Sequence, residues 1–409
     1  MNRARWLFPV AAVAFVMAGD FKATPVLDSL PFDLTFGTAA VVASAVGCLL
    51  VRRQLRPELL HVAVGFGLLL PSVFIADATP YGSDKILRFF TLTLLAVLAP
   101  VVYVRSPGDI EKHAWAWAGF SCLVVASAIV NPQASATTNG AAVTAQGVDT
   151  IGLGAAAGLV VIVMTLGLAW HRVPWFVALP LGGGGLYALL QSGSRGPLFS
   201  AVLAIAVGAV AARSRPKAAR TAVLGALCLA GVAVSFAAAP PDSRERIMTV
   251  LQGRTLGTDV ETRQSLYDIA VRSITEHPFG IGWGNFQNIA FANYLYPHDL
   301  FLEVLAEEGV FFGGLFLLWI AVHAVRARYA AVDHAGGLVL ALVVFMIGTA
   351  SVSGDINDNR KLFFALGLAI AARALVRRHP VLAAGDPPPD PRADRGPRPR
   401  HELTEGRAR

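Results

Sequence analysis

Charged side chains are scarce in this sequence. Asp, Glu, Lys and Arg make up 15% of the 409 residues, whereas hydrophobic residues make up 55%. The mean hydropathy is +0.57. A soluble globular domain carries about 25% charged residues. The composition therefore excludes a soluble protein and indicates a chain that lies in a membrane.

Cysteine is rarer still, with 3 residues in the whole chain. Cys48, Cys122 and Cys228 all lie inside apolar runs, where they are interpreted as small core residues. The sequence therefore provides neither a disulfide framework nor a cysteine metal cluster.

Alternation of polar and apolar residues, which is the pattern of a transmembrane barrel, is lacking in the apolar runs. These runs are instead continuous, and about 20 helical residues cross a ~30 Å hydrocarbon core. We therefore predict an all-α, polytopic membrane helical bundle. It has about twelve transmembrane helices, over residues 6–19, 34–51, 58–76, 86–104, 114–130, 150–170, 174–190, 197–212, 221–239, 299–325, 337–352 and 361–376.

The first apolar run follows MNRAR and has two interpretations, a signal peptide or a retained helix. A clear small-x-small cleavage site is lacking and many spans follow, so we favour a retained helix.

The short connections between the predicted spans alternate between those rich and those poor in basic residues. With the N-terminus in the cytoplasm, the basic residues of the rich connections all face inward: Arg52, Arg53, Arg56, Arg105, Lys112, Arg172, Arg213, Arg215, Lys217, Arg220, Arg326 and Arg328. Lys and Arg retained inside set topology, so both termini are predicted to be cytoplasmic. The net charge of +7 then reflects topology, and no nucleic-acid partner is expected.

The chain divides into two parts by composition. Residues 379–409 are rich in Pro, Arg and Asp and are predicted to form a disordered cytoplasmic tail. Residues 1–378 form the membrane domain, with one large external loop at 240–298, and loops of this length are usually functional.

Within this loop, residues 261–276 place Leu266, Ala270 and Ile274 on one face of an amphipathic helix. The helix is expected either on the outer membrane surface or across the bundle. In HPFGIGWGNF, residues 277–286, the glycines prevent a regular helix and favour close backbone packing over a nucleotide site. Trp283 and the aromatic residues after it are typical of a membrane-interface belt.

The loop ends in YPHDLFLEVLAEEG, where Asp299 is predicted to cap the next helix. This places His298 at the external mouth of the bundle. Histidines at helix starts are commonly structural, yet imidazole is the side chain best suited to move a proton near neutral pH. His298 is therefore the first candidate for a general base.

Three arginines stand where positive charge is otherwise rare. Arg195 lies in QSGSRGP, where we expect Ser194 and Gly196 to turn the chain and Pro197 to begin a helix whose free amides attract an anion. Arg88, in SDKILRFF, either snorkels to the interface or serves the site. Arg263 on the loop helix is either a solvated charge or a ligand. Guanidinium groups bind phosphate oxygens two at a time, so the sequence indicates a phosphate or diphosphate ligand.

The order SGSRG, R-x-x-x-x-x-D-x-A, HPFGIGWGNF and PHDLFLEVLAEEG over roughly residues 85–376 resembles the O-antigen ligase and polymerase superfamily of bacterial membrane glycosyltransferases. The resemblance implies a GT-C-like bundle in the bacterial inner membrane. It also implies transfer of a glycan from undecaprenyl diphosphate to an acceptor hydroxyl at the periplasmic face. The implied partners are this donor, a glycolipid or glycan acceptor and membrane lipids.

By the same resemblance, Arg195, Arg263 and His298 match the family's catalytic positions, and Arg88 matches a basic residue of an early span. Asp355 matches an acidic residue of the last external loop, and Asp299 replaces the asparagine that usually follows the histidine. The implied reaction is inverting and independent of metal, with Arg88, Arg195 and Arg263 on the diphosphate. No cofactor is expected.

Three alternatives stay open on sequence. Asp355 and Asp358 either bind a divalent cation or are solvated, with Asp355 orienting an arginine or the histidine. Ligase and polymerase share the chemistry and differ in acceptor. A transporter or flippase for a lipid-linked glycan would also use arginines at membrane level, although no inverted pair of broken helices supports one.

Overall fold

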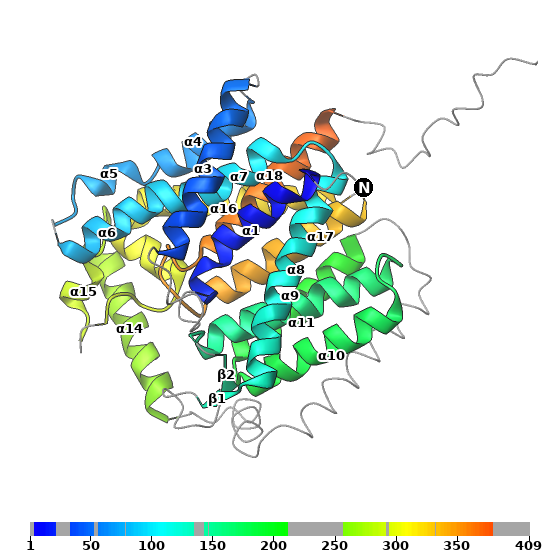
Figure 1. Cartoon of the computed structure of the whole chain (residues 1–409). Helices are drawn as coiled ribbons and strands as arrows, with labels where there is room; N and C mark the ends of the chain where they lie inside the picture. The colour runs from blue at the N-terminus through cyan, green and yellow to red at the C-terminus, as the bar shows by residue number, and fades with distance from the viewer. Residues whose placement is uncertain are drawn as a thin grey trace, which may run out of the picture.

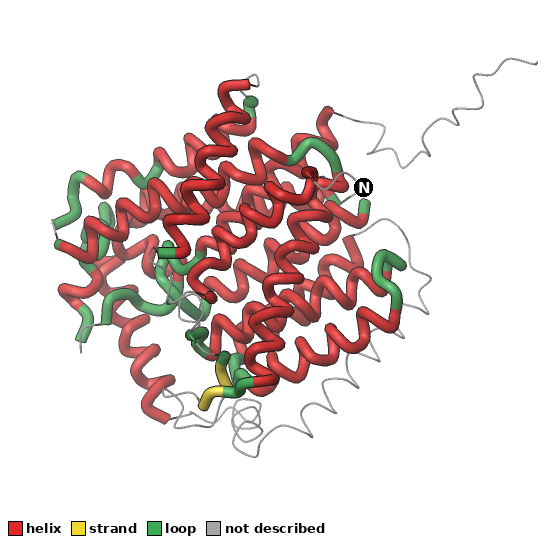
Figure 2. Tube along the Cα trace, in the orientation of Figure 1, coloured by secondary structure: helices red, strands yellow, loops and turns green. Residues whose placement is uncertain are grey.

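The computed structural model describes residues 4–21, 33–52, 56–77, 79–134, 143–145, 147–211, 257–291, 294–331 and 333–378. Figure 2 shows that these ranges are almost entirely helical. Two short strands, β1 (Gln133–Ala134) and β2 (Val143–Thr144), pair in antiparallel fashion. The all-α prediction is confirmed.

The helices follow the apolar runs of the sequence. In chain order they are α1 (Ala4–Phe21), α3 (Leu34–Arg52), α4 (Glu58–Gly67), α5 (Leu70–Val73), α6 (Pro80–Arg88), the π-helical turn η1 (Phe89–Thr93), α7 (Leu94–Tyr103), α8 (Pro107–Val130), α9 (Thr150–Ala169), α10 (Trp175–Gln191), α11 (Arg195–Ala211), α14 (Gly257–Glu276), α15 (Phe286–Ile289), α16 (Leu300–Ala330), α17 (His334–Ala350) and α18 (Arg360–Arg378).

Among the described residues, 5 helical segments are long and apolar enough to cross a membrane: Leu34–Arg52, Pro80–Tyr103, Pro107–Val130, Thr150–Ala169 and Leu300–Ala330. Shorter apolar helices accompany them. Each predicted span that falls on described residues coincides with helix, whereas the span 221–239 and the tail 379–409 lie outside the described residues. The chain is a polytopic membrane protein.

The first apolar run forms α1, which packs against α3 and α8. Its side chains Phe15 and Met17 are buried in the main hydrophobic core. In this structure the run is an integral part of the bundle.

Polar contacts define two ends of the bundle. One end, here called the basic end, is tied together by three pairs: Arg378 with Glu58, Arg172 with Glu111, and Arg56 with the Val101 carbonyl oxygen. The opposite end, here called the site end, carries α14 and the hairpin toward the lower left of Figure 1. There Lys361 at the start of α18 pairs with Asp20 at the end of α1.

Helix α16 is interrupted at Gly309, where φ is +80°. The glycine-rich turn of residues 277–285 fits against this interruption. Backbone amides of Ile281 and Gly282 donate to carbonyl oxygens of α16 at 3.1 and 2.9 Å, and the Val310 amide donates to the Pro278 carbonyl at 2.9 Å. A Cβ on Gly280 would overlap the Glu307 carbonyl. The prediction of close backbone packing is therefore confirmed.

The amphipathic helix α14 packs across the bundle on α16. Leu266 and Ala270 are fully buried with Ala306 of α16 and Phe286 of α15. Trp283 is also fully buried, and its Nε1 donates to the Leu69 carbonyl oxygen at 3.4 Å. The expectation that Trp283 belongs to an interface belt is therefore wrong, because this side chain anchors the loop inside the core.

Candidate active site

Arg195 is the first residue of α11, at the site end. The chain turns before it at Gly193, whose φ is +64°, so the expectation that Ser194 and Gly196 make the turn is wrong. The helix also begins two residues earlier than the Pro197 start expected from sequence. The Ser194 hydroxyl donates to the Thr150 carbonyl oxygen at 2.7 Å and fixes this turn against the start of α9.

Gly196, the next residue, lies against the loop of residues 351–359 between α17 and α18. A Cβ on Gly196 would overlap Cγ2 of Val352 and stand 3.2 Å from its Cβ. Glycine is therefore required here for close approach rather than for a turn. This contact places the start of α11 directly beside Val352.

Arg263 reaches the same residue from the other side. Its Nη1 donates to the Val352 carbonyl oxygen at 2.9 Å, and its guanidinium also bonds to the Tyr267 side chain. Arg263 is half-buried, so the solvated-charge interpretation does not describe it. Val352 is therefore the point at which the segments that carry Arg195 and Arg263 meet.

His298 precedes α16 and has a φ of +61°, which is uncommon for a residue with a Cβ. Residues held in this region cost about 1–3 kcal/mol and cluster at functional sites. The imidazole stands edge-on to the Tyr296 ring, with centroids 4.7 Å apart. The Asp299 carboxylate accepts hydrogen bonds from the amides of Phe301 and Leu302 at 2.8 and 3.0 Å. Asp299 is thus the predicted helix cap and sets the position of His298.

The surroundings of His298, burial first among them, favour its neutral form. Burial lowers the pKa of the imidazole below its ordinary value, the positive charge of Arg263 lowers it further, and the negative charge of Asp149 opposes both effects. A neutral imidazole accepts a proton, as a general base must. The structure therefore brings Arg263 within electrostatic range of His298.

Among the described residues, the hydrogen bond and the ion pair of the Arg88 side chain are with its own helix and not with Arg263 or His298. Its side chain is 51% exposed and its Nε bonds to Asp84 on the same helix at 3.0 Å. This is the geometry of an exposed surface ion pair.

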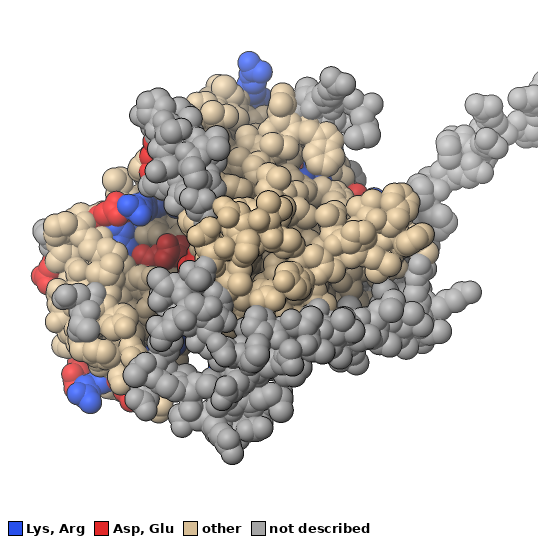
Figure 3. Space-filling view, turned by 60° about the horizontal axis from the view of Figure 1, so that its bottom comes forward, with Lys and Arg blue, Asp and Glu red and all other residues tan. Residues whose placement is uncertain are grey.

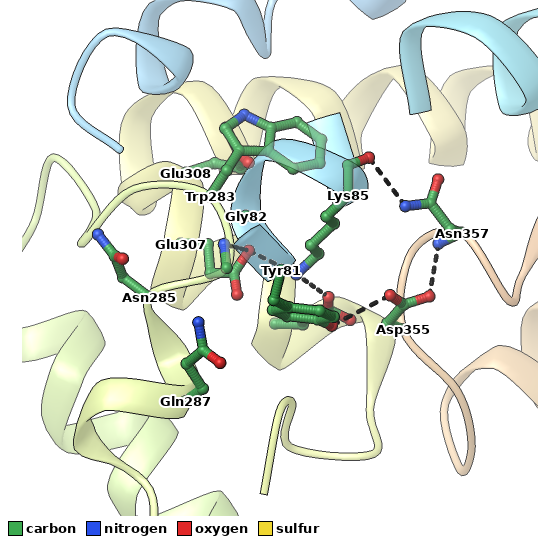
Figure 4. Close-up of polar contacts among 12 residues, drawn as sticks. Tyr81, Gly82, Lys85, Trp283, Asn285, Gln287, Glu307, Glu308, Asp355 and Asn357 are labelled. Carbon is green, nitrogen blue, oxygen red and sulfur yellow. Dashed lines mark hydrogen bonds and ion pairs between the residues drawn. The ribbon is translucent and has the colours of Figure 1, made fainter. Parts of the chain in front are cut away.

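Lys85, one turn before Arg88, is the buried cation of this helix. Its Nζ lies 2.6 Å from the Glu307 carboxylate and forms a second ion pair with Glu303, and all three side chains are at most 2% exposed (Figure 4). The same Glu307 carboxylate accepts the Gly284 amide at 2.9 Å. The cluster thus ties α6, the glycine-rich turn and the first turns of α16 together.

Asp355 connects this cluster with the loop at Val352. Its carboxylate accepts the Tyr81 hydroxyl at 3.2 Å and the amides of Asn357 and Asp358 at 2.8 Å each. Asn357 in turn donates to the Lys85 carbonyl oxygen at 2.9 Å (Figure 4). Asp355 therefore holds its own loop in shape, and through that loop it supports Arg263.

Charged side chains gather at one place on the visible surface. Figure 3, which turns the lower side of Figure 1 forward, shows acidic and basic side chains gathered around a hollow. Most of the remaining described surface in that view is uncharged.

The family comparison covers the middle of the chain. Residues 180–318 match the family model described as O-antigen ligase. Arg195, Arg263 and His298 lie inside the matched segment, whereas Arg88 and Asp355 lie outside it. A comparison with curated proteins finds no match. This match agrees with the motifs and the helical membrane fold, and the matched part of the chain is similar to the O-antigen ligase family.

Proposed function

We propose that the chain transfers a glycan from undecaprenyl diphosphate to a hydroxyl group of an acceptor, with inversion and without a metal ion. One observation carries the proposal, namely that the three candidate residues lie in segments that meet. Arg263 lies within electrostatic range of His298. Arg263 also contacts Val352, and the start of α11, which carries Arg195, packs against the same valine. The match of residues 180–318 to the family model described as O-antigen ligase, which points to an enzyme of glycosyltransferase type, supports it.

The donor would lie with its diphosphate toward Arg195 and Arg263. Each guanidinium carries five N–H donors, so bonds to Val352 and Tyr267 leave donors on Arg263 for phosphate oxygens. The positive end of the α11 dipole adds to the attraction at Arg195. These groups stabilise the negative charge that grows on the leaving diphosphate.

The acceptor hydroxyl attacks the anomeric carbon while His298 takes its proton. The new glycosidic C–O bond forms as the bond to the diphosphate oxygen breaks, and the diphosphate leaves with the electron pair. Attack from the face opposite to the leaving group inverts the anomeric carbon. Asp299 acts by holding His298 in place through the α16 cap.

Arg88 and Asp355 have supporting roles in the proposal. Arg88 sits near the membrane surface, where it meets the diphosphate headgroup as the donor enters. Asp355 keeps residues 351–359 in the shape that receives the Arg263 bond.

We place the site end on the periplasmic side of the bacterial inner membrane and the basic end, with both termini, in the cytoplasm. The excess of arginine at the basic end supports this orientation. Residues 1–378 then form one transferase domain.

Ligase and polymerase activities differ in the acceptor that they use. A ligase uses a lipid A core or another terminal acceptor, whereas a polymerase uses a second lipid-linked repeat. The description of the matched family as O-antigen ligase favours the ligase.

The test uses purified full-length protein in detergent, a synthetic undecaprenyl-diphosphate-linked glycan, and each of the two acceptors in turn. We expect an inverted glycosidic product with one acceptor, formed equally well in the presence of a chelator. If intact donor moves across vesicles and no glycosidic bond forms, the protein is a transporter and the proposal is overturned.

A further inference from the structure

A pocket lies at the basic end of the bundle, far from the site described above. It opens between the first turn of α4 and the last turns of α16 and α18, and its polar lining residues are Glu58, His61, His323, Arg326, Arg373 and Arg377. Some 26 residues of helix separate Asp299 from Arg326, which corresponds to roughly 40 Å. The pocket is therefore separate from the proposed transfer site.

The lining has an excess of positive charge. Its carboxylate, Glu58, is paired with Arg378, which lies outside the lining, at 3.0 Å. The three arginines of the lining, Arg326, Arg373 and Arg377, therefore outnumber its carboxylate. The Arg373 guanidinium lies over the Tyr329 ring, 5.6 Å from its centroid.

The pocket is also lined by two histidines in ring contact. His61 and His323 have centroids 5.5 Å apart, and His323 is only 5% exposed. The Trp319 indole donates to the His61 carbonyl oxygen at 2.8 Å and packs edge-on against His323. An imidazole supplies an N–H donor in either protonation state, so the two histidines add hydrogen-bond donors to the charge of the arginines.

Topology alone explains basic residues at this end but not their grouping. Arg52 and Arg172 satisfy the positive-inside pattern while lying outside the pocket. A pocket lined by three guanidinium groups and two imidazoles offers the donors that bind phosphate oxygens. Basic pockets between membrane helices on the cytoplasmic side bind anionic lipid headgroups.

We propose that this pocket binds the phosphate group of an anionic membrane lipid. The helices that form it, α16 and α18, begin at the site end, next to His298 and next to the loop of residues 351–359. A bound headgroup would therefore join the far ends of the two helices that support the transfer site. The inference does not depend on the proposed reaction.

The test measures lipid binding by purified full-length protein in detergent with native mass spectrometry and thermal unfolding. Phosphatidylglycerol is compared with zwitterionic phosphatidylcholine. The variant Arg326→Gln/Arg373→Gln is compared with Arg52→Gln/Arg172→Gln, which removes the same charge from the same end outside the pocket.

We expect wild type to prefer phosphatidylglycerol. The pocket variant should lose about 30-fold in affinity for it, from about 1 kcal/mol per arginine, whereas the control loses much less. The single variant Arg377→Gln, whose side chain is exposed, should show a smaller loss with unchanged folding.

Two results would overturn the assignment. Equal losses in the pocket variant and the control would show a diffuse charge effect. Protection against heat by millimolar inorganic phosphate, abolished in the pocket variant, would show that the ligand is free phosphate and not a lipid headgroup.

Discussion

Nη1 of Arg263 donates a hydrogen bond to the carbonyl oxygen of Val352 at 2.9 Å. This bond joins α14 to the loop between α17 and α18, and the start of α11 packs on the same valine. Segments that lie far apart in the sequence therefore meet where the proposed diphosphate binds.

The first prediction concerns this bond. Arg263→Gln should lower kcat/KM for glycan transfer about 10²–10³-fold, because loss of a preorganised donor to the transition-state charge has this effect. Arg272→Gln on the exposed face of the same helix is the matched control and should stay near wild type. Equal rates in the two variants would remove Arg263 from the site.

The pH profile provides the second prediction. His298 works as a base only when neutral, and its folded pKa lies below 6.5. Activity should therefore persist at pH 6.5 and fall as the pH drops through the lower folded value. Loss of the Arg263 charge raises this pKa, so the acid limb of Arg263→Gln should move to higher pH.

The measured quantity is the pH at which the acid limb of the activity profile falls, and it does not depend on the absolute rate. Arg272→Gln should leave the limb where it is in wild type. An unshifted limb in Arg263→Gln would mean that another group controls the profile.

Gly196 gives a third prediction. Gly196→Ala adds a methyl group that overlaps Val352, and overpacking of this kind costs about 1–3 kcal/mol. Activity and Tm should both fall, because the loop of residues 351–359 must shift. Gly183→Ala on α10 meets nothing within 4 Å and is the control. A Gly196→Ala protein with the activity and Tm of wild type would show that this close approach is unimportant.

Much of the fold could be predicted from sequence because apolar runs, helix caps and amphipathic faces are local patterns. The helices, the Asp299 cap and the amphipathic face of α14 all follow from such patterns. The interruption of α16 at Gly309 could not be predicted, because it depends on a turn that supplies hydrogen bonds from another segment.

The buried cluster of Lys85, Glu303 and Glu307 shows a different limit of prediction from sequence. Lys85 and Arg88 are three residues apart, and sequence alone does not tell which one faces the interior. A signal was nevertheless present, since Glu303 and Glu307 stand four residues apart on one helix face within an apolar run. Charges inside a span require a partner, and Lys85 is that partner.

The fourth prediction compares the loss of Lys85, which is buried, with the loss of Arg88, which is exposed. Lys85→Met leaves Glu303 and Glu307 buried without their cation, which costs about 3–5 kcal/mol. Arg88→Met breaks an exposed pair worth about 0–1 kcal/mol. Thermal unfolding in detergent should show a large loss of Tm for the first variant and little change for the second. Similar Tm values would contradict the role of the cluster.

The central claim is that His298 is the base of a glycan transfer. Purified wild-type and His298→Ala proteins should be compared for binding of an undecaprenyl-diphosphate-linked glycan and for its transfer to acceptor. We predict that the variant binds the donor as wild type does and forms no glycosidic product. Transfer by His298→Ala at the wild-type rate would contradict the account.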